Sequence, residues 1–151
     1  MNKWDERLLG LAEYVSTWSK DPSTQVGAVI AKGNRIVSLG FNGFPSGVDD
    51  HPERYADRDT KLAMVLHAEE NALLFARQDL TCCTAYVWPM PPCANCAAKL
   101  IQAGISRVVA PAPTAEQVER WGKGFDIAAK MFQEAGVILD QVVLPQEPSR
   151  E

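Results

Sequence analysis

The chain has 151 residues, of which 46% are hydrophobic, a size and composition typical of one globular domain whose core needs no disulfide bonds. Its net charge of −4 argues against binding to nucleic acid through the overall field of the protein and favours a small substrate. No apolar run is long enough to span a bilayer, and the first residues lack the apolar stretch of a signal peptide, so we expect a cytoplasmic protein.

Helical and strand periods alternate along the chain. In order, they predict a helix over residues 2–19, strands over 25–31 and 35–41, a helix over 67–76, a strand over 85–88, a helix over 94–103, a strand over 107–110, a helix that begins at Thr114 and ends at Gly136, and a strand over 137–143. We therefore expect an α/β fold with an antiparallel hairpin at one side and two parallel last strands. Residues 1–144 form the predicted domain, and residues 145–151 form a polar tail.

Three other local signals refine this outline. Thr114 and Gln117 form a capping-box pattern at the start of the last helix, and Gly122 and Gly124 are expected to interrupt that helix. Residues 42–61 have no periodicity. Because long connections of this kind are usually functional or mobile, we expect this one to border the active site.

Four residues carry the strongest chemical signal: His67, Glu69, Cys93 and Cys96. The two cysteines are three residues apart, so at the start of a helix both thiolates can reach one ion, and His67 can close a third corner from a second helix start. A catalytic zinc uses three protein ligands and leaves one position open for water. The pattern H-x-E … P-C-x-x-C is the signature of zinc-dependent nucleobase deaminases, in which the glutamate carries protons and does not bind the metal. The alternative is a closed, structural site completed by Cys82 or Cys83.

Five stretches resemble blocks of the deoxycytidylate (dCMP) deaminases, within the cytidine deaminase-like superfamily. They are HAEENA at 67–72, SKDPSTQVGA at 19–28, GFNGFPSG at 40–47, DTK at 59–61 and IQAGI at 101–105. The similarity covers nearly the whole chain, to about Val143. The zinc pattern alone would indicate only the superfamily, and the blocks at 19–28 and 40–47 narrow it to the dCMP branch.

The resemblance implies hydrolysis of dCMP to dUMP and ammonia, which supplies thymidylate synthesis. It implies a three-layer α/β/α fold around a five-stranded mixed sheet and a catalytic Zn²⁺. Some members carry a second zinc site in an insertion, but the equivalent stretch here offers only His51 and no cysteine, so we expect one Zn²⁺ per chain. Members form homo-oligomers, so a hexamer is expected first and a dimer or tetramer second. They are activated by dCTP with Mg²⁺ and inhibited by dTTP, and effector binding would be sought at Gly40, Phe41, Asn42 and Gly43.

Substrate contacts are expected from three regions. Asn42, a polar residue at a strand end beside glycines, is expected to bind the deoxyribose, with a role as a turn former as the alternative. Asn71 is expected to brace the Glu69 loop or to contact the sugar, and otherwise to be a helix-surface amide. Lys20, Ser23 and Thr24 are candidates for the 5′-phosphate, because a lysine supplies charge and hydroxyl groups supply direction.

Two departures from the family pattern keep other functions open. Phe41 stands where the family usually has tyrosine, which removes a hydroxyl group from the expected effector region. The approach to Cys93 looks one residue longer than usual, so a 5-substituted dCMP or free (deoxy)cytidine is an alternative substrate. A tRNA- or single-stranded-DNA-editing deaminase and a non-enzymatic zinc module are further alternatives. His51 is interpreted as a solvated loop residue.

Overall fold

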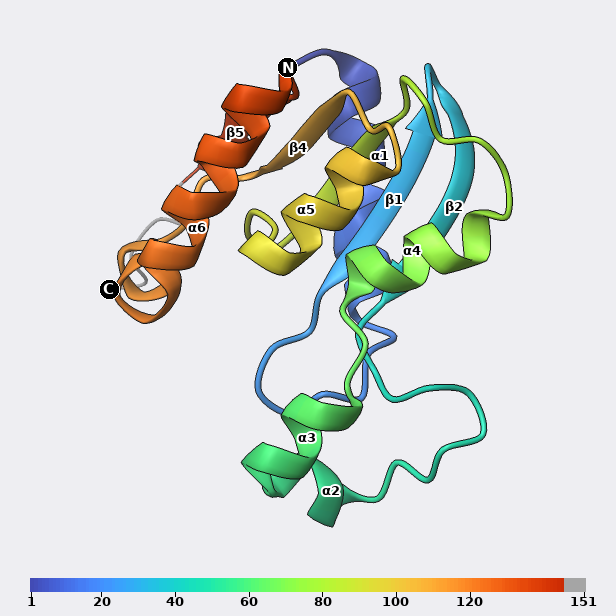
Figure 1. The fold of residues 1–151 in the computed structure, drawn as a ribbon, viewed down its shortest axis with the longest axis vertical. Coiled ribbons are helices and arrows are strands. Elements are labelled where there is room, and N and C mark those ends of the chain that lie inside the picture. The colour runs from blue at the N-terminus through green and yellow to red at the C-terminus, as the bar shows by residue number, and fades with distance from the viewer. Residues whose placement is uncertain (146–151) are drawn as a thin grey trace.

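The computed structural model describes residues 1–145, and a five-stranded mixed sheet forms its centre (Figure 1). The strand order is β2-β1-β3-β4-β5. β1 pairs antiparallel with both β2 and β3, whereas β3, β4 and β5 run parallel to one another. The predicted hairpin and the parallel last strands are therefore confirmed. The strands are β1 (Gly27–Lys32), β2 (Arg35–Phe41), β3 (Thr84–Trp88), β4 (Arg107–Pro111) and β5 (Ile138–Val142).

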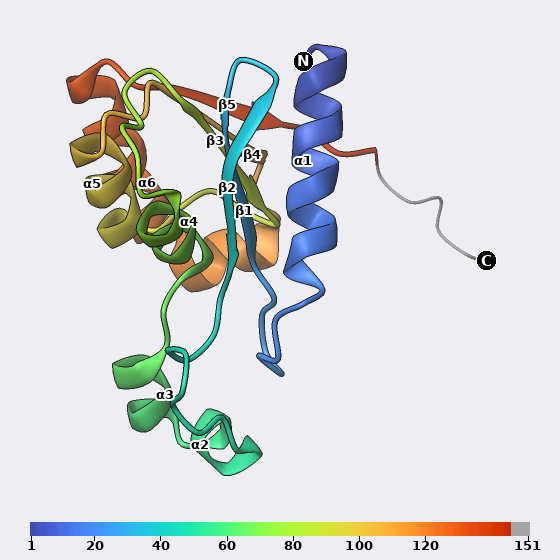
Figure 2. The same cartoon turned by 90° about the vertical axis from the view of Figure 1, so that its right-hand side faces the viewer.

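Helices cover both faces of the sheet, which confirms the three-layer α/β/α architecture. Figure 2 shows α1 alone on one face and α4, α5 and α6 together on the other, while α2 and α3 extend beyond one end of the sheet. The helices are α1 (Lys3–Ser16), α2 (Pro52–Ala56), α3 (Arg58–Met64), α4 (Ala68–Ala76), α5 (Ala94–Gln102) and α6 (Ala115–Ala135). No helix within residues 1–145 is both long and apolar enough to cross a membrane.

Two hydrophobic cores lie on opposite faces of the sheet, because successive side chains of a strand point in opposite directions. In β1, Ala28 and Ile30 pack in the core beneath α4, α5 and α6, whereas Val29 and Ala31 pack in the core beneath α1. Both faces of β1 are thus buried. This double burial explains why its sequence is continuously apolar and not alternating.

α1 is held to the sheet at its first turn by a buried ionic group. Asn2 caps the helix by accepting a hydrogen bond from the backbone N–H of Asp5. The Asp5 carboxylate, 2% exposed, accepts two hydrogen bonds from the Arg107 guanidinium, at 2.8 and 2.9 Å, and one from the Tyr86 hydroxyl, at 2.9 Å. The pKa of Asp5 is lowered to about 2, chiefly by the hydrogen bonds from Arg107. This group connects α1 with β3 and β4.

Three expectations about local structure are corrected. The aperiodic connection over 42–61 contains α2 and the first part of α3. Both helices are short: α2 starts at Pro52, and Asp57 caps α3 by accepting a hydrogen bond from the N–H of Thr60. α1 ends at Ser16, three residues earlier than expected. α6 is continuous through Gly122 and Gly124. The predicted tail lies outside the described residues, except for Pro145.

Candidate active site

The candidate metal ligands meet where two helices begin side by side. His67 precedes α4, Cys93 precedes α5, and Cys96 lies in the first turn of α5. The ligand atoms of the three residues lie within 4.8 Å of one another. The imidazole Nδ1 of His67 is 3.6 Å from the Cys93 Sγ and 3.3 Å from the Cys96 Sγ. The structure thus brings together three residues that lie up to 29 positions apart in the sequence.

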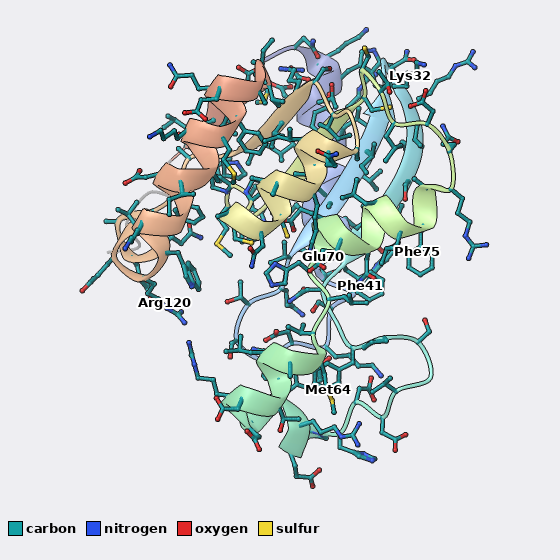
Figure 3. The ribbon with its side chains drawn as sticks, viewed as in Figure 1. Lys32, Phe41, Met64, Glu70, Phe75 and Arg120 are labelled. Atoms are coloured by element: carbon teal, nitrogen blue, oxygen red, sulfur yellow. The ribbon has the colours of Figure 1, made fainter. Side chains whose placement is uncertain are left out.

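Glu70, labelled in Figure 3, connects the start of α4 with the last turn of α5. One of its oxygens accepts a hydrogen bond from the backbone N–H of His67 at 3.1 Å, which caps α4. The other oxygen forms an ion pair with Lys99 of α5 at 2.7 Å. This glutamate therefore fixes the backbone of one ligand residue relative to the helix that carries the two cysteines.

Hydrogen bonds among the three candidate ligand groups shift their pKa values in different directions. A hydrogen bond from the Cys96 thiol is the main cause that lowers the pKa of Cys93 to about 4, and the pKa of Cys96 is raised. The pKa of His67 is raised to about 8, chiefly by its hydrogen bond with the Cys93 thiolate. A thiolate is the form of cysteine that binds metal. The donor set of one imidazole and two thiols is chemically suited to zinc.

Glu69 lies directly beside this cluster and is almost completely buried, with 4% of its surface exposed. Its Oε1 atom has no hydrogen-bond partner among the described residues. Burial raises the pKa of this carboxyl group, because an apolar environment disfavours the charged form. A carboxyl group with a raised pKa and a free oxygen is equipped to accept and return a proton.

The two remaining cysteines are not part of the cluster. Cys82 and Cys83 precede β3, whereas Cys93 follows it. The five residues of this strand place its two ends roughly 16 Å apart. Cys83 is fully buried in the core between the sheet and α4, α5 and α6. Among the described residues, the group that could hold a metal consists of His67, Cys93 and Cys96. The structure therefore does not support a closed site with a third cysteine.

A cleft of about 610 Å³ opens above these residues. His67, Glu69 and Cys93 line it, together with the loop before β1, with Asn42, with α3 and with the approach to Cys93 at Met90 and Pro91. The first half of α6, from Val118 to Phe125, forms the remaining wall. The connection over 42–61 thus borders the site as expected. Trp88, the last residue of β3, does not line the cleft and packs against the core beneath α1.

The residues expected to bind substrate divide into two groups. Ser23, Thr24 and Asn42 line the cleft, whereas Lys20 and Asn71 do not. Lys20 forms an exposed ion pair with Asp50 at 2.8 Å. Asn71 donates a hydrogen bond to the backbone carbonyl of Phe41 at 2.8 Å, so it connects α4 with the end of β2.

Asn42 and Asp21 hold the loop that precedes β1. The Asn42 amide accepts a hydrogen bond from the N–H of Val26 and donates to the carbonyl of Thr24 and to Asp21. Asp21 also accepts hydrogen bonds from the N–H groups of Ser23 and Thr24, and its Oδ1 lies 2.9 Å from the Lys61 ammonium. These backbone donors are thus already engaged by a carboxylate.

Gly40, Phe41 and Gly43 lie beside α4. A Cβ atom on Gly40 would lie 2.5 Å from the backbone N of Ala72 and 2.6 Å from the carbonyl O of Ala68, so this position requires glycine. The backbone of Gly43 pairs with Leu66, immediately before His67. Phe41 is 37% exposed and contacts Trp18 edge to face.

Sequence reasoning missed four basic residues in the cleft: Arg58 and Lys61 of α3, and Arg120 and Lys123 of α6. It also missed Trp121, which lies under the Arg120 guanidinium at 4.4 Å. These residues are far apart in the sequence and form no basic run. The available signal was the spacing of three residues in each of the pairs Arg58/Lys61 and Arg120/Lys123, which places both members on one helical face.

Comparison with known proteins agrees with this geometry. Residues 2–112 match the family model described as cytidine and deoxycytidylate deaminase zinc-binding region. The chain is 53% identical over 137 residues to a protein of Aliivibrio fischeri described as an uncharacterized deaminase in the luxG 3′ region, covering 91% of this chain and 92% of that one. It is 42% identical over 150 residues to a probable deoxycytidylate deaminase of Caenorhabditis elegans, covering 96% and 73%.

A solved structure has the same fold. The dCMP deaminase of cyanophage S-TIM5, in complex with dCMP and dUMP, superposes with a TM-score of 0.71 at 25% identity, over 94% of this chain and 99% of that one. The family model covers most of the chain and includes both helix starts that carry the clustered ligands. This chain therefore belongs to the cytidine and deoxycytidylate deaminase family.

Proposed function

We propose that the protein converts dCMP and water to dUMP and ammonia with the help of one zinc ion. The observation that carries this proposal is the buried Glu69 carboxyl group, with one unpartnered oxygen, next to the His67, Cys93 and Cys96 cluster on the wall of a cleft. The relationship to proteins named deoxycytidylate deaminase supports the choice of substrate. The product dUMP would supply thymidylate synthesis, and we place the reaction in the cytoplasm.

Each residue has a defined task in this proposal. His67, Cys93 and Cys96 hold the zinc ion, which as a Lewis acid lowers the pKa of water at the site. Glu69 accepts one proton from the attacking water and delivers it to N3 of the cytosine ring. It then accepts the second proton from the oxygen now bonded to C4 and gives it to the amine, which departs as ammonia. The burial that raises the pKa of Glu69 supports this task, because a shuttle must hold its proton during part of the cycle. Met90 and Pro91, which line the cleft, would shape the base pocket.

Effector control and assembly are further parts of the proposal. The Gly40–Gly43 segment contacts the residues on both sides of His67 through Leu66 and Ala68. A nucleotide effector that moved this segment would therefore move a metal ligand. We propose regulation by dCTP, with Mg²⁺, and by dTTP through this contact, and we propose a homo-oligomer. Titration of the activity with each effector and the mass in solution by light scattering test both statements.

The decisive experiment combines metal analysis with turnover. Purified protein is expected to hold one zinc per chain and to release ammonia from dCMP. The variant Glu69→Gln is expected to keep the zinc ion and the fold, and to lose a factor of about 10²–10⁴ in kcat, the range that a positioned proton carrier contributes. The variant Cys96→Ser is expected to lose the metal.

Alternative substrates give distinct results in the same assay. Turnover of deoxycytidine or of a 5-substituted dCMP without turnover of dCMP would replace the proposed substrate and keep the chemistry. A Glu69→Gln variant with wild-type kcat would show that another residue carries the proton. Tight zinc binding without turnover of any of these compounds would indicate a non-enzymatic zinc module.

A further inference from the structure

Residues 44–65 form a small lobe that is joined to the rest of the molecule by a narrow neck. Figures 1 and 2 show its helices, α2 and α3, beyond the end of the sheet. The neck is the bridge between Gly43 and Leu66, whose backbones exchange two hydrogen bonds at 3.1 and 2.8 Å. Within the lobe, the rings of Phe44 and Tyr55 are stacked with their centroids 4.4 Å apart. This internal packing lets the lobe move as a unit about the neck.

The lobe is fastened on one side only, by two ion pairs with the loop before β1. Lys61 pairs with the buried carboxylate of Asp21 at 2.9 Å. Asp50 pairs with Lys20 at 2.8 Å. On the opposite side, no ion pair or side-chain hydrogen bond within residues 1–145 joins the lobe to α6, although α3 and α6 line the same cleft. The lobe is therefore free to approach α6 while its other side stays attached.

Apolar side chains are exposed on both walls of the free side of the cleft. Leu62 of α3 is 59% exposed and Val118 of α6 is 49% exposed, although both line the cleft. When the two walls approach, both side chains lose contact with water together, which is favourable. α3 contributes no buried residue, so its movement towards α6 would break no packing of the hydrophobic cores. Closure therefore buries apolar surface without loss elsewhere in the fold.

We propose that residues 44–65 are a lid, which pivots at the neck between Gly43 and Leu66 and closes onto α6 when a nucleotide occupies the cleft. A ligand that touches both walls favours the arrangement in which the walls are closest. Closure brings Leu62 against Val118 and excludes water from the space above Glu69, where a dry site strengthens electrostatic interactions and prevents the leakage of protons. This inference rests on the proposed deaminase function and adds control of access to that site.

Disulfide crosslinking measures the approach of the two walls. Leu62→Cys and Val118→Cys are combined in zinc-loaded Glu69→Gln protein that also carries Cys82→Ser, which removes the exposed native thiol, and the protein is oxidised with diamide. A disulfide forms only when the two Cα atoms come within about 7 Å. Saturating dCMP should speed its formation by about 10-fold or more, because the closed form of the free protein is a minor state of roughly 10% or less.

A second cysteine pair is the matched control. Leu62→Cys is combined with Ile127→Cys, since Ile127 is an exposed residue of α6 that does not line the cleft. This pair should crosslink slowly with and without dCMP. A similar acceleration of both pairs by dCMP would show a general loosening of the protein and would overturn the lid.

Turnover and binding separate this inference from the proposed reaction. With Glu69 present, the crosslinked protein should turn over dCMP at least about 10-fold more slowly, because a locked lid stops substrate entry and product release, and dithiothreitol should restore the rate. Calorimetric binding of dCMP without faster crosslinking of the Leu62→Cys, Val118→Cys pair would overturn the lid, as would full turnover by the crosslinked protein. Wild-type protein that does not deaminate dCMP would refute the proposed reaction, whereas crosslinking accelerated by bound dCMP would still support the lid in that case.

Discussion

Replacement of Gly40 by alanine tests the contact between β2 and the helix that presents His67 and Glu69. The added Cβ atom would lie 2.5 Å from the backbone N of Ala72 and 2.6 Å from the carbonyl O of Ala68. Carbon contacts are favourable only at about 3.5–4.0 Å, so β2 and α4 must separate by about 1 Å. Both neighbours are backbone atoms of a helix, and neither can rotate away. We therefore expect a loss near the upper end of the overpacking range, about 3 kcal/mol in the free energy of unfolding.

The same displacement should reach the active site, because Ala68 lies between His67 and Glu69. A misplacement of about 1 Å costs roughly 10²-fold in rate. We expect Gly40→Ala to lower kcat on dCMP by about this factor and to weaken zinc retention. This loss should be present without added dCTP or dTTP, in contrast to a change confined to effector binding.

Urea unfolding, zinc content and dCMP turnover measure the three consequences. Gly10→Ala is the matched control: Gly10 lies within α1, and its added Cβ would meet no atom within 4 Å. Because alanine is a better helix former than glycine, this variant should gain about 0.5–1 kcal/mol. Wild-type stability and turnover in Gly40→Ala would refute the reasoning, because they would show that β2 does not lie against α4 as described.

Three further variants test other parts of the structure. Asp5→Asn should lower the free energy of unfolding at pH 7 by about 3 kcal/mol, because it leaves the Arg107 charge without its buried partner. The pKa of Asp5 is lowered to about 2 from an ordinary 3.8, so its carboxylate stabilises the fold by about 2 kcal/mol at pH 7 and by about 1 kcal/mol at pH 3. Urea unfolding at both pH values should show that the variant lacks this loss of stability in acid. An equal pH dependence in the two proteins would contradict the role of Asp5. Glu70→Ala removes the cap of α4 and the ion pair with α5, so chelator competition should reveal a zinc affinity about 10-fold lower, and unchanged affinity would exclude this bracing role. The pair Cys82→Ser and Cys83→Ala should leave the zinc content unchanged, whereas loss of metal would favour a site with a third cysteine.

Local patterns in the sequence predicted the strands and the longer helices, and they indicated the chemistry of the candidate site. The ligand residues His67 and Cys93 stand at helix starts because each lies immediately before a helical apolar pattern, and the Cys-x-x-Cys spacing places Cys96 on the same side. The capping box at Thr114 was likewise readable, since Thr114 and Gln117 are three residues apart and exchange hydrogen bonds. Such features depend on neighbours within one helical turn, so they need no knowledge of the rest of the chain.

Short helices and glycines inside helices were harder to interpret from the same patterns. α2 has five residues and α3 has seven, too few for an apolar period to emerge. The expected break of α6 at Gly122 and Gly124 did not occur. A glycine costs about 1 kcal/mol in a helix, and Phe125, Ala128 and Phe132 of the same helix are buried against the protein core, which outweighs that cost.

The sequence by itself indicated the candidate donor set and proton carrier, and it determined the order of the strands and of the helices other than α2 and α3. Only the tertiary structure decided which basic residues share the cleft with them. Arg58 and Arg120 are 62 positions apart and line one cleft because α3 and α6 both reach its walls. Only the tertiary structure likewise showed that the Asn42 amide is engaged by the loop before β1 and that Lys20 pairs with Asp50. Contacts between distant residues depend on how the sheet and its helices pack, and no local spacing in the sequence encodes them.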